Sequence, residues 1–354
     1  HSDKAYDSVI LHVVSEADTE ITRTNGEQIP QLLLTCPENV RLHYHELCVA
    51  DQYPACHPIL ASLPKLTIHS WLTALQTERL EQKARLITQR LALCNRNWED
   101  AFFITLARNF GFGLNGDAFE TWAGLLPFRA LDKHRNDLFQ IEAFFYGLAG
   151  LLEETFLKKE QEDEYSLRLC KEFRYLQRKF EIGQGMDATL WRFLRLRPEN
   201  FPHIRLAQLA YLYQKGDKLF SRLLEAETLA DVRTLLDART SPYWENHYLF
   251  GRPSSQKEKT MGERSKDLII INTVVPFLYT YGLHKTDERM CERAGRFLEE
   301  LKAESNHIIR SWSDAGLPVV SAADSQALIQ LQKEYCDKRK CLYCRFGYEY
   351  LKHT

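Results

Sequence analysis

The sequence predicts a mostly helical α+β protein, in which a short β element at residues 1–36 precedes a large helical body at residues 37–354. Strand-forming, β-branched residues are concentrated in residues 9–35. From Pro37 onward, apolar residues recur every three or four positions in one segment after another, which is the spacing of amphipathic helices. With 354 residues, 44% hydrophobic and 27% charged, the chain is long enough to bury a substantial core.

The β element contains three strand candidates, at residues 9–14, 19–24 and 31–35. Asn25-Gly26 lies between the second and third candidates. Both central residues of a type I′ turn need a positive φ, so this dipeptide predicts that those two strands form a hairpin. An isolated hairpin is only marginally stable in water, and we therefore expect further strands to complete a partial sheet.

The helical body is predicted from apolar spacing and from residues that favour helix ends. Pro37 suits the first turn of a helix at residues 38–49, and Asp117 with Glu120 suggests a capping box. Pro276 predicts a kink. A charged connector at residues 153–164 is the candidate internal boundary. The other expected helices are residues 67–94, 98–110, 118–126, 136–152, 202–214, 219–225, 230–238, 268–281, 288–304, 308–312 and 324–336.

A further helix, beginning near Arg168 and ending before Gly183, has two chemically different faces. Leu169, Phe173, Leu176 and Phe180 form an apolar stripe, and the bases lie away from it. Because the net charge of the whole chain is only −2, attraction to a polyanion has to come from such a local region. We therefore predict that DNA or RNA phosphates are contacted by Arg168, Lys171, Arg174, Arg178, Arg195, Arg197 and Arg205, interleaved with aromatic residues.

One alternative interpretation is that the basic side is simply a solvated helix face. Another is that the protein is a non-enzymatic helical scaffold or interaction protein. In that case the arginines would form internal ion pairs with acids such as Glu142 or Glu199. The acids between Arg168 and Arg205 are few, namely Glu172, Glu181, Asp187 and Glu199.

A basic turn at residues 336–347 contains Cys336-x4-Cys341-x2-Cys344, a spacing typical of zinc or iron–sulfur half-sites. The fourth ligand is missing, and His353, Cys170 or Cys291 could supply it through the fold; the alternative is a plain helical turn with cysteines. The neighbouring bases are expected to lower the thiol pKa values, and they are Lys338, Arg339, Lys340 and Arg345. A second, irregularly spaced group is attributed to chance: His43, His45, Cys48, Cys56 and His57.

The remaining sequence patterns exclude several classes of function and do not indicate a specific activity. Gly111-x-Gly113-x-x-Gly116 matches a dinucleotide fingerprint, but a helix precedes it, so we interpret it as a turn between packed helices. No nucleophile elbow, Walker loop or zinc-protease helix occurs, and whether the protein is an enzyme is left open. Nine cysteines, several of them single within helical stretches, fit a reducing compartment. With no membrane-spanning run or signal peptide, we expect a cytoplasmic protein that does not enter a membrane.

Four runs together resemble an uncharacterised bacterial family, domain of unknown function 2851. They are Tyr6–Val14, Asn109–Phe119, Arg197–Pro202 and Tyr335–Gly347. The resemblance implies an upstream segment with acidic runs similar to the metal-binding core of restriction-endonuclease-like nucleases. Those runs are not in this sequence. The β element is accordingly expected to be a remnant of such a core, and the chain a nucleic-acid-binding protein of nuclease-like ancestry without the catalytic acids.

Overall fold

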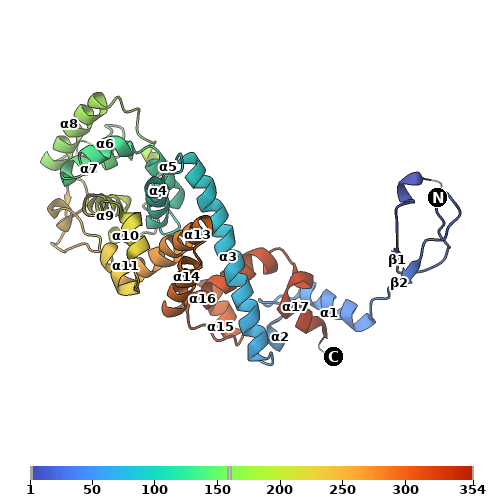
Figure 1. Cartoon of the computed structure of the whole chain (residues 1–354). Helices are drawn as coiled ribbons and strands as arrows, with labels where there is room; N and C mark the ends of the chain where they lie inside the picture. The colour runs from blue at the N-terminus through green and yellow to red at the C-terminus, as the bar shows by residue number, and fades with distance from the viewer. Residues whose placement is uncertain (1–2, 158, 160–161, 353–354) are drawn as a thin grey trace. The chain divides into compact units, whose positions relative to one another are not determined.

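The computed structural model describes residues 3–157, 159 and 162–352, and its contacts divide the chain into two compact units (Figure 1). The first unit comprises His1–Trp71, Ser305–Pro318 and Leu328–Thr354, and the second comprises Leu72–Glu304 and Val319–Ala327. The expected fold class is confirmed, because the described residues are mainly helical with two small two-stranded sheets. The sequence-based division at residue 36 differs from these units and stays a prediction. Residues 153–164 lie inside the second unit.

In the first unit, the expected hairpin is replaced by a parallel pair of strands. β1 (His12–Val14) pairs with β2 (Gln31–Leu33), with His12 opposite Gln31. The turn at Asn25-Gly26 does form, with a φ of +83° at Gly26, but it closes only one antiparallel bridge, between Thr22 and Gln28. Pro30 has no N–H with which to extend an antiparallel ladder. Its carbonyl instead accepts a hydrogen bond from His12 N (2.9 Å), which leads the chain across to β1.

The helices of the first unit pack the C-terminal segment against the N-terminal one. The Tyr350 hydroxyl on α17 donates to Glu46 on α1 (3.0 Å), and the Tyr350 ring meets His43 edge-on. α1 has the bounds expected from the sequence, whereas α2 begins within the proline-marked loop, with Pro58 in its first turn. The helices are α1 (Glu38–Val49), α2 (His57–Leu60), the start of α3 (Lys65–Leu93) through Trp71, α15 (His307–Asp314) and α17 (Arg345–Lys352).

The second unit is a helical body with one small hairpin, β3 (His247–Leu249) with β4 (Arg252–Pro253). Besides most of α3 and the start of α16 (Ala322–Gln330), its helices are α4 (Trp98–Phe110), α5 (Gly116–Gly124), α6 (Phe128–Lys133), α7 (Leu138–Leu148), α8 (Glu164–Lys179), α9 (Pro202–Lys215), α10 (Leu219–Glu225), α11 (Leu229–Leu235), α12 (Glu263–Ile269), α13 (Val275–Lys285) and α14 (Glu288–Glu300). α4 and α10 have the bounds expected from the sequence.

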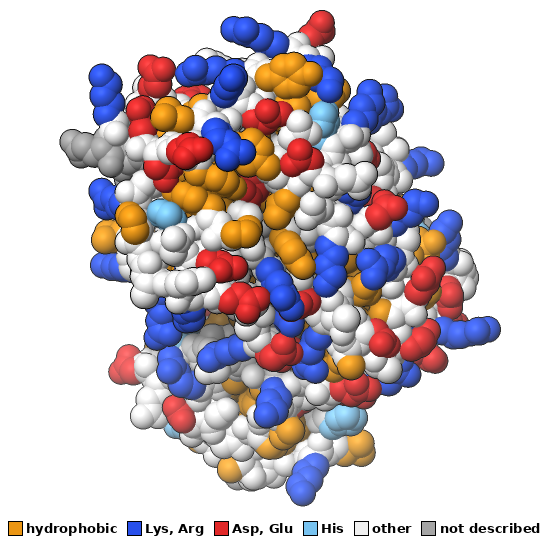
Figure 2. All heavy atoms as spheres, turned by 90° about the vertical axis from the view of Figure 1, so that its left-hand side faces the viewer, with side chains coloured by type: hydrophobic (Ala, Val, Ile, Leu, Met, Phe, Trp, Pro, Cys, Tyr) orange, Lys and Arg blue, Asp and Glu red, His pale blue; other side chains and the backbone are white. Residues whose placement is uncertain are grey.

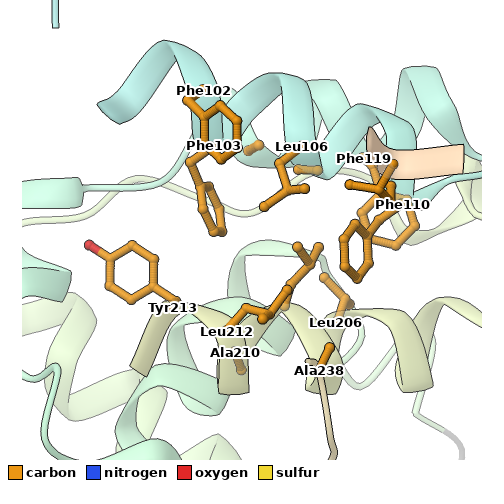
Figure 3. Packing of buried hydrophobic residues seen from close by; sticks show 14 of the residues in the cluster. Phe102, Phe103, Leu106, Phe110, Phe119, Leu206, Ala210, Leu212, Tyr213 and Ala238 are labelled. Carbon is orange, nitrogen blue, oxygen red and sulfur yellow. The ribbon is translucent and has the colours of Figure 1, made fainter. Parts of the chain in front are cut away.

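Aromatic packing fills the interior of the second unit. Phe103 and Phe110 on α4 lie opposite Tyr213 and Leu206 on α9 (Figure 3). Trp122 on α5 is fully buried, and its Nε1 donates to the carbonyl of Phe145 (3.0 Å). Each such side chain contributes roughly 1.5–3 kcal/mol of transfer free energy. Charged groups that lie inside this core, such as Glu142 and Arg205, are buried with hydrogen-bond partners.

The glycine run is a turn between α4 and α5, as the sequence predicts. A Cβ at Gly111 would clash with the backbone of Gly116, and Gly113 has a φ of +90°. The expected capping box is wrong, because α5 begins at Gly116 without a side-chain cap. Asp117 and Glu120 instead pair with Arg108 on α4.

Pro276 lies in the first turn of α13, directly after a π-helical stretch at Ile270–Val274. The kink expected at this proline stays a prediction. A proline is tolerated at the start of a helix, and the wider π turn releases the carbonyl that would otherwise clash with its ring.

α8 is positioned by close packing on α7. The ring of Phe173 on α8 occupies the space over Gly147 on α7, where a side chain would clash with it. Gly185, which follows α8, lies directly against the carbonyls of Gly147 and Leu148. The contact between the two helices thus depends on a missing Cβ.

Gly147→Ala is expected to lower the free energy of unfolding by about 1–3 kcal/mol, because the added methyl group overlaps the ring of Phe173. Gly295→Ala, in the middle of α14 with nothing within 4 Å of its Cβ position, is the matched control and should be neutral or stabilising by up to about 1 kcal/mol. Urea unfolding of both variants tests this, and equal effects would contradict it.

Candidate functional site

The N-terminus of α8 is fixed by a capping box. Asp163 accepts a hydrogen bond from Ser166 N (2.8 Å), and the Ser166 hydroxyl accepts one from Asp163 N (3.0 Å). The other carboxylate oxygen of Asp163 accepts from the Tyr243 hydroxyl and from Gly251 N (3.2 Å). One aspartate thus begins the basic helix and attaches it to the segment that carries the β3–β4 hairpin.

α8 presents opposite chemistry on its two sides. Leu169, Phe173 and Leu176 are buried, as their spacing predicts. The opposite side exposes five bases and one aromatic residue: Arg168, Lys171, Arg174, Tyr175, Arg178 and Lys179. Arg168 lies over the ring of Phe139 (5.0 Å).

The loop that follows is held rigidly and adds two predicted bases. Trp191 Nε1 donates to Ala149 O (2.8 Å), and the side chain of Asn115 bonds both backbone groups of Arg192, N at 2.8 Å and O at 2.9 Å. Beyond this anchor, Arg195 with a φ of +65° and Arg197 are exposed.

The bases of this region are largely unpaired. Of the six exposed bases from the predicted set, only Arg174 makes an ion pair within the described residues, with Glu154 at 3.4 Å. We call these six the α8 basic surface: Arg168, Lys171, Arg174, Arg178, Arg195 and Arg197. On the face shown in Figure 2, basic side chains are interspersed with acidic ones, so any positive surface is local.

Three of the four acids between residues 168 and 205 have other partners. Glu172 accepts from Gln140 Nε2 (2.7 Å), and Asp187 accepts from Thr189 N (2.8 Å). Glu199 forms its ion pair with Lys257, although the charge of Arg197 also helps to lower the pKa of Glu199. Within the described residues, none of these three acids forms an ion pair with the α8 basic surface.

Arg205 differs from the other predicted bases because it is buried, with 6% of its surface exposed. Its guanidinium donates to Asn200 and Gln208 and lies over the ring of Phe112 (4.5 Å), and burial lowers its pKa to about 10. α9 is buried around most of its circumference, so helical spacing alone could not show that this arginine faces inward. We therefore leave Arg205 out of the surface.

Glu142, the other acid suggested as an arginine partner, lies fully buried on α7. Its Oε2 accepts from the hydroxyls of Tyr165 and Ser241, and its Oε1 has no hydrogen-bond partner among the described residues. Burial raises its pKa to about 7, against the lowering effect of these hydroxyls. Glu142 is therefore a core group that keeps its proton up to about pH 7.

A second candidate site lies in the first unit, where five of the nine cysteines line one cavity of about 280 Å³. They are Cys48, Cys56, Cys336, Cys341 and Cys344. Cys48 and Cys56, which belong to the group attributed to chance, thus line the same cavity as the three predicted C-terminal cysteines. Sequence spacing could not reveal this, because some 280 residues separate Cys56 from Cys336. Among the described residues, no three His, Cys, Asp or Glu side chains form a group that could hold a metal ion directly.

Two of the three fourth-ligand candidates named from the sequence, Cys170 and Cys291, do not line this cavity. Cys170 and Cys291 belong to the second unit, where their thiols donate to the carbonyls of Leu152 (3.4 Å) and Tyr279 (3.6 Å). His353 lies outside the described residues.

The thiols of the cavity are not activated in the way expected. Burial raises the pKa of Cys336 to about 12 and also raises the pKa values of Cys56, Cys341 and Cys344. Arg339 lowers the pKa of Cys341 only slightly against this effect. The bases are exposed to water, so the loss of hydration at the sulfurs outweighs their charge.

Backbone contacts shape the C-terminal part of the cavity. The turn carrying the cysteines is closed by hydrogen bonds from Arg339 N to Cys336 O (3.0 Å) and from Cys344 N to Cys341 O (3.2 Å). A Cβ at Gly347 on α17 would clash with the Cys341 carbonyl, so the glycine lets the turn pack on the helix.

The chain belongs to the family described as Protein of unknown function (DUF2851), which matches residues 1–307. No curated protein and no solved structure matches it. Within the part of the chain that the structure describes, none of the helices has the length and apolar character needed to cross a bilayer.

The raised pKa of Glu142 predicts a pH-dependent stability. Between its ordinary value of 4.5 and about 7, the folded protein retains a proton that the unfolded chain has released, so stability falls as pH rises through this window. Glu142→Gln removes the ionisation, and the wild type should lose about 3 kcal/mol relative to this variant between pH 4.5 and 7. Urea unfolding of both proteins across this range tests it, and parallel pH profiles would refute it.

Proposed function

We propose that this member of the DUF2851 family binds nucleic acid through the α8 basic surface. The observation that supports the proposal is the exposure of six bases, of which only one forms an ion pair within the described residues, while three of the four acids between residues 168 and 205 have other partners. A polyanion can supply the missing counter-charges, and its binding would release condensed counterions.

The composition of the surface favours contacts to phosphates. Five of its six bases are arginines, whose planar guanidinium groups match phosphate oxygens in a bidentate manner. Tyr175, with 56% of its surface exposed, stands among them and offers a ring on which an unpaired base could stack. Such contacts position a nucleic acid without reading its sequence.

The scaffold alternative is less well supported. It requires arginines buried against carboxylates such as Glu142 or Glu199, yet Glu142 accepts from Tyr165 and Ser241, and Glu199 pairs with Lys257. The nuclease-like ancestry rests on the family resemblance alone, so our proposal is for binding and assigns no catalytic group. The bases of the C-terminal turn belong to the first unit and are not part of the surface.

Binding of a nucleic-acid duplex should weaken steeply with salt. With six phosphate contacts, the slope of log Kobs against log salt concentration is expected to be about −5. Arg174→Glu with Arg178→Glu should reduce the steepness by about 2 or more and lower affinity at least about tenfold, because two attractive contacts become repulsive. Fluorescence anisotropy with a labelled oligonucleotide at several salt concentrations measures both quantities.

The matched control is Lys285→Glu with Arg289→Glu, which changes the net charge equally at exposed bases in the same unit but away from α8. It should leave the salt slope nearly unchanged. Equal losses in both double variants would indicate a general charge effect, and undiminished binding in the α8 variant would refute the proposed surface.

A further inference from the structure

The cysteine-lined cavity brings together sulfurs from distant parts of the chain. Cys56 directly precedes α2, and Cys336 ends the π-helical turn Leu331–Cys336. Cys341 begins the 3₁₀ turn Cys341–Tyr343, and Cys344 directly follows it. All four side chains line the same space. They belong to one unit, which packs these segments together independently of the α8 basic surface.

Buried hydrogen-bond donors surround these sulfurs without conventional acceptors. The indole N–H of Trp71 is buried, has no hydrogen-bond partner within the described residues, and stabilises the thiolate form of neighbouring Cys344. Trp312, which lines the cavity and is fully buried, also has an Nε1 without a described partner. Tyr53 is 42% exposed, and its hydroxyl interacts with Cys336. Buried donors in native proteins are rarely left unsatisfied, so the two indole N–H groups point to an acceptor-rich occupant.

From this arrangement we propose that Cys56, Cys336, Cys341 and Cys344 hold an iron–sulfur cluster in the cavity. Four cysteine thiolates are the usual ligand set of such clusters. The C-x4-C-x2-C spacing of the three C-terminal cysteines is that of plant-type ferredoxins, although the remote cysteine here precedes the three and does not follow them. Cluster sulfides and cysteine sulfurs accept N–H and O–H hydrogen bonds, which gives the indoles and the tyrosine acceptors.

The cavity favours a cluster over a zinc ion. Four sulfurs bound to one zinc at about 2.3 Å would lie about 3.8 Å from each other and leave no space between them. Here the four cysteines line a cavity of about 280 Å³, and among the described residues no three of them form a group that could hold one metal ion directly. An inorganic core of iron and sulfide would fill part of this volume.

Cys56, not Cys48, is the fourth ligand in this proposal. Cys56 is buried and interacts electrostatically with all three C-terminal cysteines. Cys48 at the end of α1 is only partly buried and interacts with Cys341 and Tyr44.

Incorporation of the cluster is balanced without an external oxidant. Each cysteine sulfur forms one bond to iron as one terminal ligand of the preformed cluster leaves, and the departing ligand or the solvent takes up the thiol proton, so loading leaves the oxidation states unchanged.

The test is the metal content of the full chain, produced without a histidine tag and purified under nitrogen. Iron and acid-labile sulfide should be present in equal amounts, about two or four of each per chain, with the visible absorption of thiolate-ligated iron and an electron paramagnetic resonance signal in one redox state. One zinc per chain without iron would overturn the proposal. So would a folded chain that neither contains iron nor takes up a cluster on anaerobic reconstitution with iron and sulfide.

Single variants test the ligand set. Cys56→Ser should lose most of the iron, whereas Cys48→Ser and Cys94→Ser, a partly buried cysteine of the second unit, should retain it. Retention of iron by Cys56→Ser would refute the assignment. Should Cys56→Ser fail to fold, Trp71→Phe provides an independent readout. It should keep the cluster but lower its reduction potential, because one hydrogen bond to a ligating sulfur is removed, and an unchanged potential would contradict the assigned contact.

Discussion

The burial of α7 on all sides is the constraint on which the second unit depends. Every residue from Ile141 to Leu148 is buried, so each polar group on that stretch needs a hydrogen-bond partner inside the protein. Glu142 accepts hydrogen bonds from two hydroxyls and keeps its proton up to about pH 7, and the Tyr146 hydroxyl donates to the carbonyl of His203 (2.7 Å). The one residue without a side chain, Gly147, admits the ring that seats α8. The position of α8 thus depends on its packing against α7, whose residues Ile141 to Leu148 are all buried.

The positive character of the α8 surface arises from how charges are partnered as well as from their number. The same stretch of sequence carries four acids, which could have cancelled many of the bases. Three of the four have other partners. Glu172 accepts a hydrogen bond from Gln140, Asp187 accepts one from a loop N–H, and Glu199 pairs with Lys257. Charge counting along a sequence detects such a window, but only three-dimensional partnering decides whether it remains positive.

Much of the helical body could be predicted from local patterns, whereas features that depend on remote contacts could not. The bounds of α1, α4 and α10 follow from prolines, apolar spacing and capping residues. The parallel pairing of β1 with β2 depends on how the chain crosses from one strand to the other, which turn chemistry does not specify. Arg205 and Cys56 show the same limit at the candidate sites. An arginine on a helix buried all round, and a cysteine whose partners lie near the other end of the chain, leave no local signature.

The composition of the first unit from segments at both ends of the sequence has a consequence for biosynthesis. Its N-terminal part, through Trp71, leaves the ribosome long before Ser305 is translated. At about 5–20 residues per second, the intervening segment takes on the order of 10–50 s to make. During this delay α1 and α2 lack the helix on which they pack, and their apolar faces are open to chaperones. The continuous stretch of the second unit can fold first, so the nascent chain matures from its middle outward.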